Sequence, residues 1–592
     1  MSRHRLLNVR TLFPILTALL LVIAVACGSS ATETPKAAAP AAKAPAKAAP
    51  KAANTAVPAP QAQATQAPVV AVTGKAGGVA RMSAYADTKD WDPKGSGSLS
   101  SIQAVSQLYN QLVQMDTVDT SLVVCDLCES WEISNGGQTF TYKIRDGIKW
   151  IDGMDLTGVD VHHSMLRYGD LDGKTGRSGL WRNYVLEAKA GGVNLLDEQT
   201  VEFNLQFPSG AFMKFLAVDY VKVLPKHLLD QGIDLNTGEA VIDNKSGSGP
   251  FVLDEYQRGN FYKVSKNDNY FKEGRPFFDG IDHFIITDQG TLIAQMKAGQ
   301  IDMSNGGFTN LSPTQAFELE KDTNGAMYPV AVSPSADWGL MLNINKAPYN
   351  DARVREAIQL AIDYQQWNSL VFDDTSGVGC PLMGLAHTFE ECLTWPGLRP
   401  KDGPGGADDM AKAKALMADA GFPDGFKTKY DVRQVGTYPD QCAVVKEQLK
   451  AALGIDGEMA TYPSAAGYSL FGTSREAEGD WEMACQGEGQ VVLDVDGIVG
   501  GVYSDGATRN YTNWTNDKVD ALFELQKVEQ DPDKRREINK EMELFLFTQE
   551  DNHWITLGWG VLQWMIGEDI RGFNAPETVQ THFKHEDLWL DR

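Results

Sequence analysis

The side chains that could do chemistry are few, and they do not form a catalytic set. The sequence has no H-E-x-x-H zinc motif and no G-x-S-x-G nucleophile turn. Residues 169–175 resemble a phosphate-binding loop, but three residues instead of four separate the glycines, and no apolar strand precedes them. His162 and His163 are adjacent, so on a helix they would point about 100° apart and could not easily share a metal. We therefore expect no catalytic residues, no metal, no cofactor and no enzymatic activity.

Two short acidic runs resemble calcium-binding loops. Residues 170–173 and 494–497 both have the pattern D-x-D-G. Tyr168 and Val492 stand where the first carboxylate ligand would have to be, and a calcium loop needs that ligand. We expect no calcium at either run.

The charge of the chain excludes one class of partner. The formal net charge is -25, and residues 1–75 hold eight Lys or Arg and only one acid, so the remainder is more acidic still. Nucleic acids bind to basic surfaces, so we expect no nucleic-acid partner. The content of 43% hydrophobic and 22% charged residues is that of a globular protein, and 592 residues suffice for three or four domains.

The N-terminus has the features of a secretory signal peptide, residues 1–26. Its apolar run, residues 15–26, is shorter than the ~20 residues of a membrane-spanning helix. Small residues before Cys27 resemble a bacterial lipobox, which implies cleavage before Cys27 and a diacylglycerol on its sulfur. A secretory signal with an incidental cysteine is the alternative. Residues 27–75 are rich in Ala, Pro and Lys and cannot bury enough apolar surface to fold, so we expect a linker that tethers the body to the outer face of the membrane.

Six cysteines remain after Cys27, an even number in a compartment that permits disulfides. Cys380 and Cys392 flank a stretch with Pro and Gly, and they are the first pair that the sequence suggests. Cys442 with Cys485 is the second pair. The two cysteines of the C-x-x-C run at 125–128 form either a local disulfide or two packed thiols, and no second C-x-x-C exists to complete a zinc site.

Strand and helix signals alternate along the body of the chain, which is typical of α/β proteins. Residues 78–82 predict a first strand, and apolar residues at helical spacing predict a helix from about Ser101. An Asn-Gly turn at 135–137 between two alternating runs predicts a hairpin. Thr157, followed three residues later by Asp160, predicts the start of a helix.

A series of short sequence blocks follows one another in order from residue 129 to residue 522. The blocks are ESWEIS at 129–134, RDGIKW at 145–150, GSGPF at 247–251, FDGI at 278–281, MKAGQID at 296–302, NIN at 343–345, DARVREA at 351–357, AGFPDGF at 420–426 and VDAL at 519–522. In combination and order they resemble the signature of peptide/nickel-type, or family 5, extracytoplasmic solute-binding proteins of ABC importers. Ile151, where many members have His, and the cysteine-containing run 124–128 depart from the family pattern, which argues against assigning a close relative's substrate.

The resemblance implies an α/β, two-lobed periplasmic-binding-protein-like fold of the large class, with an extra domain on the first lobe. Lobe one would comprise residues 76–333 and 555–592, with residues 111–243 as the inserted domain. Lobe two would comprise residues 334–554. The chain would cross between the lobes near residues 333–339 and 557–560.

The resemblance also places candidate ligand-binding residues on loops that face the junction of the lobes. The candidates are Trp91 and Asp92 after the first strand, Trp338 at the first crossover, and Glu488, Asp494 and Asp496, which lie where peptide-binding relatives have an acidic partner for the ligand's amino terminus. A buried ammonium group without a carboxylate would cost several kcal/mol. The alternative for each Trp is a place in the core, and for each acid a solvated loop.

We expect a lipid-anchored, monomeric protein that closes over a small, peptide-like solute and delivers it to the permease subunits of an ABC importer. Oligosaccharides, opines and nickel complexes are alternative solutes. A secreted hydrolase is the alternative from another class, and it would need a nucleophile with a base, or paired carboxylates, which the sequence does not present.

Overall fold

The structure of the protein is a computed structural model that describes residues 72–592 with interruptions. The interruptions are residues 95–97, 170–180, 182–183, 188–189, 210, 307–310, 472–478, 491–492, 506, 508, 513, 530 and 549–552, and the side chains of residues 333–335, 465 and 488–489 are likewise not described. The expected signal peptide, Cys27, the first part of the expected linker and the 170–173 motif lie outside the described residues.

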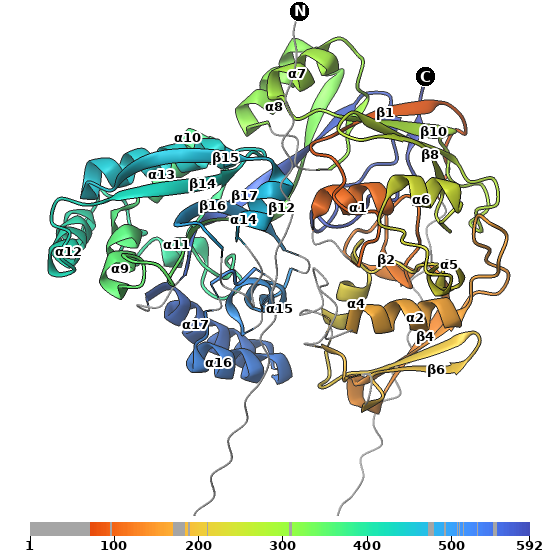
Figure 1. Cartoon of the computed structure of the whole chain (residues 1–592), viewed down its shortest axis with the longest axis horizontal. Coiled ribbons are helices and arrows are strands. Elements are labelled where there is room, and N and C mark those ends of the chain that lie inside the picture. The colour runs from red at the N-terminus through yellow and green to blue at the C-terminus, as the bar shows by residue number, and fades with distance from the viewer. Residues whose placement is uncertain are drawn as a thin grey trace, which may run out of the picture. The chain divides into compact units, whose positions relative to one another are not determined.

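A large mixed sheet runs through the described part of the chain (Figure 1). In order across the sheet its strands are β15 (Asp456–Tyr462), β14 (Lys427–Arg433), β16 (Met483–Gly489), β12 (Met327–Leu342), β17 (Trp554–Gly567), β11 (Met303–Ser304), β1 (Val79–Ala84), β10 (Gly280–Ile285), β9 (Phe261–Lys266) and β8 (Phe251–Gln257), with β13 (Gly377–Val378) beside β17. Strands β14, β15 and β16 run parallel, as do β1, β10 and β11. Parallel neighbours need crossover connections, so each parallel group is an α/β unit.

Strands β12 and β17 join the two parallel groups. They are 16 and 14 residues long and pair antiparallel from Met327 opposite Gly567 to Met341 opposite Trp554. The register shifts twice along this pair, between Val332 and Ala336 and between Trp338 and Gly339. The two stretches expected to cross between lobes, 333–339 and 557–560, are thus parts of two long paired strands.

Helices cover the two parallel groups, and their bounds follow. Near β1 and β10 are α1 (Leu99–Val105), α6 (Gly238–Asp243), α7 (Gln289–Lys297) and α8 (Pro313–Asp322). In the part that contains β14 to β16 are α9 (Ala352–Ala361), α10 (Tyr364–Phe372), α11 (Phe389–Cys392), α12 (Gly406–Asp419), α13 (Tyr438–Leu453), α14 (Ser464–Phe471), α15 (Val495–Ile498) with a π-helical turn (Val499–Tyr503), α16 (Asp517–Val528) and α17 (Pro532–Thr548). Helix α13 connects β14 to β15 and packs on both.

A smaller sheet lies between β1 and β8 in the sequence. Its strands, in order, are β4 (Cys128–Ser134), β5 (Thr139–Ile144), β7 (Thr200–Asn204) and β6 (Val193–Asp197), and the neighbouring elements are β2 (Val113–Met115), β3 (Val123–Cys125), α2 (Gly158–Gly169), α4 (Ala211–Leu216) and α5 (Lys226–Asp230). Strands β4 and β5 form the expected hairpin around Asn135–Gly137. Helix α2 starts as expected, because Thr157 Oγ1 accepts from Val159 N and Asp160 accepts from Thr157 N.

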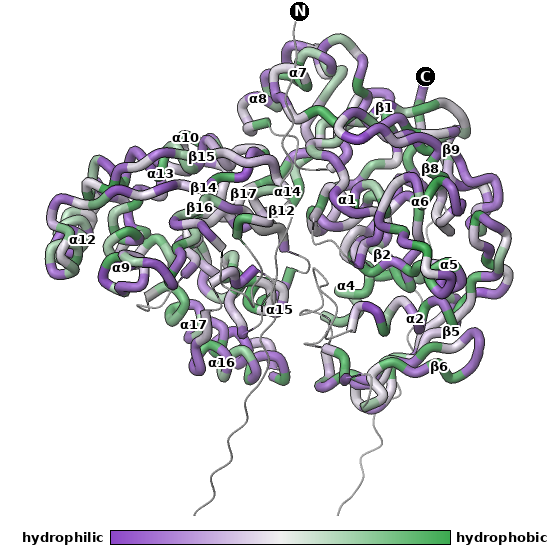
Figure 2. The backbone as a smooth tube through the Cα atoms, viewed as in Figure 1, coloured by the Kyte–Doolittle hydropathy of each residue, from purple (hydrophilic) through white to green (hydrophobic). Residues whose placement is uncertain are grey.

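The C-terminal residues return to the first parallel group and pair β18 (Ile570–Arg571) with β19 (Trp589–Leu590). Figure 2 shows hydrophilic and hydrophobic residues interleaved along the described chain rather than separated into blocks, as expected when most elements bury one face. No helix among the described residues is long and apolar enough to cross a membrane.

Three disulfides link the six described cysteines. Cys380 is joined to Cys392 and Cys442 to Cys485, the two pairs named from the sequence, and the C-x-x-C run closes on itself between Cys125 and Cys128. The Cys442–Cys485 bond ties α13 to β16 across the second parallel group, with Cα atoms 5.5 Å apart.

Trp338 lies at the centre of the sheet and requires glycine on both neighbouring strands. It is 1% exposed. A Cβ atom placed on Gly560 would lie 1.9 Å from Trp338 Nε1, and one placed on Gly487 would lie 2.5 Å from its ring. Contacts this short are repulsive, so the indole fits only because both neighbours lack a side chain.

We expect Gly560→Ala to lower the free energy of unfolding by about 1–3 kcal/mol, because the added methyl group overpacks the sheet at Trp338. The measurement is urea unfolding followed by far-UV circular dichroism. Gly501→Ala is the matched control, because a Cβ there would have no atom within 4 Å, and it should change stability by less than about 1 kcal/mol. Equal stability of Gly560→Ala and the parent protein would contradict this packing.

Candidate functional site

Trp91 and Asp92 are occupied by contacts within the protein. Trp91 is 2% exposed and meets the rings of Tyr256 and Tyr262 edge-on, with centroids 5.1 and 5.9 Å apart. Asp92 forms an ion pair with Arg167 at 2.6 Å. This pair therefore anchors the loop after β1 to the strands beside it and to α2.

Trp338 is also a core residue, and it supports a neighbouring aromatic side chain. Its ring stacks on Phe372 with centroids 5.5 Å apart, and Tyr438 meets it edge-on at 5.3 Å. Tyr438 is the first residue of α13, and its hydroxyl donates to the carbonyl of Gly487. Trp338 thus fixes the position of Tyr438.

The acidic candidates are held by a neighbouring arginine. Both carboxylate oxygens of Asp494 accept from Arg535, at 2.9 and 2.6 Å. Asp496 is 4% exposed and accepts from Gln526 and, at 3.1 Å, from the hydroxyl of Tyr184. Burial and the nearby Asp494 raise the pKa of Asp496. The side chain of Glu488 lies outside the described residues.

The structure draws attention to a residue that the sequence analysis did not name. Arg433 is the last residue of β14 and is 3% exposed. Its guanidinium carbon lies 3.7 Å from the centroid of the Tyr468 ring and 5.6 Å from that of Tyr438. Nη1 donates to Gln486 at 3.1 Å, and Nη2 donates to Ser464. Among the described residues, Nε has no hydrogen-bond partner.

The groups that act most strongly on the charge of Arg433 include no carboxylate of the described residues. The titratable groups that act on it most strongly are Tyr468, Tyr438 and Tyr85 and a second cation, Arg509. Arg509 lies over the same Tyr468 ring at 4.6 Å and donates to Tyr511. A guanidinium keeps its charge at any pH that proteins tolerate, so this place carries a buried positive charge.

Arg433 lies near the first parallel group as well as the second. Tyr85 directly follows β1, and burial raises the pKa of its phenol while the nearby Arg433 acts in the opposite direction. Tyr220, from the segment between β1 and β8, is a further electrostatic neighbour of Tyr85. The carboxyl ends of β1 and β14 therefore approach one another, and open α/β sheets bind ligands at the carboxyl ends of their strands. Arg433 is the charged residue at the carboxyl end of β14. This rule is therefore the signal that could have pointed to it from the sequence.

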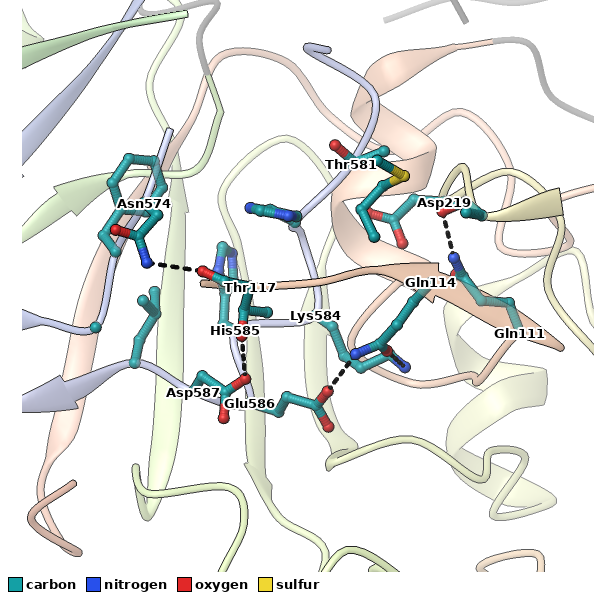
Figure 3. Close-up of a pocket in the computed structure, with 16 residues that line it drawn as sticks. Gln111, Gln114, Thr117, Asp219, Asn574, Thr581, Lys584, His585, Glu586 and Asp587 are labelled. Carbon is teal, nitrogen blue, oxygen red and sulfur yellow. Dashed lines mark hydrogen bonds between the residues drawn. The ribbon is translucent and has the colours of Figure 1, made fainter. Parts of the chain in front are cut away.

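A cavity lies elsewhere in the described structure, between β2 and the C-terminal residues (Figure 3). About 500 Å³ of empty space, which includes open solvent at its mouth, lies between the lining residues. Figure 3 labels Gln114, Asp219, Lys584, His585 and Glu586 among its lining residues, drawn from β2, a loop and the C-terminal segment.

A buried ionic network borders that cavity. Lys272 Nζ lies 2.7 Å from Asp126 and 2.8 Å from Glu586, and Lys584 also contacts Asp126. Burial alone would raise the pKa of Glu586, but Lys272 and Lys584 lower it to about 2. Burial lowers the pKa of Lys584 to about 8. Two cations thus face two anions, so this network fastens the C-terminal segment to the turn between β3 and β4, and the charges of these four described residues balance.

Cys380, Cys392 and Glu543 lie close enough together to suggest a metal site in the described part of the chain. The two cysteines are joined in a disulfide, and Glu543 accepts from the backbone of Leu382 and of His387. A thiolate, not a disulfide, binds metals. These residues therefore fasten α17 to the 380–392 loop.

Comparison with known proteins gives a consistent result. The family model of bacterial extracellular solute-binding proteins, family 5 Middle, matches residues 123–510. The oligopeptide-binding protein AppA of Bacillus subtilis is 30% identical over 322 residues, 54% of this chain and 55% of AppA. The glutathione-binding protein GsiB of Salmonella typhimurium is 28% identical over 307 residues, 51% of this chain and 54% of GsiB. The chain thus aligns with about half the length of these curated relatives.

Solved structures agree over a larger part of the chain. AppA of B. subtilis in complex with a nonapeptide covers 88% of this chain with a TM-score of 0.72 and 22% identity, and all of AppA is covered. OppA of Haemophilus influenzae in complex with the peptide RPPGFSPFR covers 88% of this chain with a TM-score of 0.75 and 17% identity, and all of OppA is covered. These likenesses confirm the α/β, two-lobed periplasmic-binding-protein-like fold.

We expect Arg433→Met to stabilise the protein, once stripped of any solute, by about 1–3 kcal/mol, because it removes a buried charge that no described carboxylate neutralises. The measurement is urea unfolding of protein refolded after extensive washing in denaturant. Arg399→Met is the matched control with the opposite expected sign, because Arg399 donates twice to the buried Asp409. Destabilisation by both substitutions to the same extent would show that Arg433 is neutralised within the protein.

Proposed function

Because the chain belongs to the bacterial extracellular solute-binding proteins of family 5, we propose that it is the solute-binding component of an ABC importer. It captures a peptide-like solute and delivers it, unchanged, to membrane permease subunits. The observation that carries the proposal is the buried guanidinium of Arg433 at the carboxyl ends of β1 and β14, where a solute would bind. The relatives named as oligopeptide- and glutathione-binding proteins favour a peptide-like solute.

We propose that residues 76–333 with 555–592 form lobe one, with residues 111–243 inserted, and that residues 334–554 form lobe two. The paired strands β12 and β17 would be the hinge, and their two register shifts support this role because they interrupt the ladder where bending would occur. The lobes then close over the solute.

Contacts between these proposed lobes support a closed form. The Tyr184 hydroxyl, from the inserted segment, donates to Asp496 at 3.1 Å. Asp373 accepts from Thr314 N at 3.0 Å and joins α8 to the loop after α10. A solute can favour this form only to the extent that it binds closed protein more tightly than open protein.

We propose that the protein acts as a monomer on the outer face of the membrane. Cys27 would carry the lipid, and the Ala/Pro-rich residues that follow would let the body reach both solvent and permease. Metabolic labelling with palmitate tests the anchor, because Cys27→Ser should abolish incorporation.

The capture function predicts that purified protein binds peptides, becomes more compact and leaves them intact. Native mass spectrometry after incubation with a mixed peptide pool would show a bound mass, and small-angle X-ray scattering would show a smaller radius of gyration. Mass spectrometry of the pool after overnight incubation would show no cleavage products. Turnover of peptides would favour a hydrolase, and the absence of any bound solute would contradict capture.

Tyr184→Phe should weaken closure without changing the fold, because it removes only the hydroxyl that reaches Asp496. We expect solute affinity to fall about 2–10-fold, because an intramolecular hydrogen bond contributes about 0.5–1.5 kcal/mol net. Tyr142→Phe is the control, because that buried hydroxyl contacts Met213 within the inserted segment and should leave affinity unchanged. An equal loss of affinity in both variants would exclude a closing role for Tyr184.

A further inference from the structure

The cavity between β2 and the C-terminal residues has the composition of a small-molecule site (Figure 3). Two histidines, His582 and His585, line it together with apolar side chains. The apolar lining residues are Met115, Ala217, Phe573 and Leu588. Ligand pockets are mostly apolar, with a few polar groups that orient the ligand. The described lining residues all belong to proposed lobe one, so this cavity is not formed by the closing of the lobes.

His585 has one ring nitrogen in use and one without a partner. It is 4% exposed, and its Nε2 lies 2.9 Å from Oδ1 of Asn305. The amide nitrogen of Asn305 is directed to Tyr262 and His283. Asn305 Oδ1 therefore accepts from His585, which places the proton of the neutral ring on Nε2. Nδ1 of His585 is then an acceptor, and it has no hydrogen-bond partner among the described residues.

His582 presents a second acceptor. Its ring forms hydrogen bonds to the backbone of Asn574 and of Asp116, whereas Nε2 has no partner in the described part of the chain. The proton is therefore on Nδ1, and Nε2 carries a lone pair. Burial lowers the pKa of His582, and it lowers the pKa of His585 to about 3, so both rings are neutral. Buried polar groups are nearly always paired, so these two acceptors indicate a donor that the described chain does not supply.

The backbone at both histidines is strained. His582 has a φ of 72° and His585 a φ of 56°. Residues other than glycine rarely adopt this left-handed conformation, and it persists only where the surrounding structure imposes it. Such strain is concentrated at binding sites. The strained backbone thus supports a binding role for the two rings.

Charge narrows the chemistry of the ligand. The ionised residues that line the cavity are already paired with opposite charges. The pairs are Asp219 with Lys222, Asp587 with Arg275, and Lys584 and Glu586 within the network of Asp126 and Lys272. A charged ligand would bring an unbalanced charge into this partly buried space. An uncharged ligand avoids that cost.

A metal ion fits the two imidazoles poorly. Zinc sites in proteins use at least three protein ligands. Within the described part of the chain, Cys380, Cys392 and Glu543 are the single group of three such ligand atoms that lie close together. His582 and His585 therefore have no third ligand beside them, and their lone pairs fit a hydrogen-bond donor instead.

We propose that this cavity is a second binding site, which takes a small uncharged molecule with an O–H or N–H group on an apolar ring or chain. The donor group faces Nδ1 of His585 and Nε2 of His582, and the apolar part packs on Phe573 and Leu588. The space of about 500 Å³ is of the size that ligand pockets have, whereas a water molecule takes up only about 30 Å³. This site is additional to peptide capture and does not depend on it.

Four fluorinated benzene derivatives test this chemistry, with binding to the purified protein measured by fluorine NMR titration. They are para-fluorophenol, para-fluorotoluene, para-fluorobenzoate and para-fluorobenzylammonium. We expect saturable binding of para-fluorophenol with a Kd of about 1 mM or tighter. Para-fluorotoluene has nearly the same shape but no donor, so it should bind about 10-fold or more weakly. The two ions should also bind more weakly, because their charge has no partner in the cavity.

His582→Asn removes one acceptor and keeps the local backbone. Asparagine tolerates the left-handed conformation, and its amide nitrogen replaces Nδ1 as a donor, but no atom replaces Nε2. His585→Gln likewise keeps a donor toward Asn305 and loses Nδ1. We expect each variant to bind para-fluorophenol about 3–10-fold more weakly and to bind para-fluorotoluene as before. His163→Asn is the control, because His163 lies on α2 and does not line the cavity.

Three results would overturn the inference. They are equal affinity for para-fluorophenol and para-fluorotoluene, tighter binding of either ion, and no saturable binding of para-fluorophenol. Unchanged affinity for para-fluorophenol in the variants would overturn it as well. If far-UV circular dichroism shows that His585→Gln does not fold, His582→Asn decides alone. The peptide-binding assay involves none of these probes, so either proposal can fail while the other stands.

Discussion

A guanidinium that leaves water keeps its charge, so a protein that buries one must offer an anion or tolerate the cost of the unbalanced charge. The partly exposed Arg399 illustrates the first solution, because the buried Asp409 accepts two of its hydrogen bonds. Arg433 shows the second, because aromatic rings and neutral acceptors surround it. Cation–π contacts offset part of that cost. The site that we propose for the solute depends on this buried positive charge, which no described carboxylate neutralises.

The sheet positions that charge. β14 ends at Arg433 and β1 ends one residue before Tyr85, so two parallel groups direct their carboxyl ends to one place. The long pair β12–β17 holds the groups in one sheet, and Trp338 fills its centre against Gly487 and Gly560. The same indole supports Tyr438, which covers Arg433. Packing at the centre of the sheet and electrostatics at Arg433 are therefore linked through one aromatic contact.

Local sequence signals predicted local structure well. The hairpin at residues 135–137 and the helix start at Thr157 depend on neighbours a few residues away, and both are present. The family blocks predicted the fold class. The candidate site was harder, because the partners that decide it are distant in sequence: Arg535 binds Asp494, and Gly560 accommodates Trp338. The sequence analysis named no role for Arg433, because only its tertiary neighbours show that it is buried, with no carboxylate partner among the described residues.

The most direct test of this account is the structure of the protein with the solute that copurifies with it. We predict that the solute lies at the carboxyl ends of β1 and β14, in contact with Arg433. A solute bound away from Arg433 would contradict the claim that this buried charge marks the ligand site.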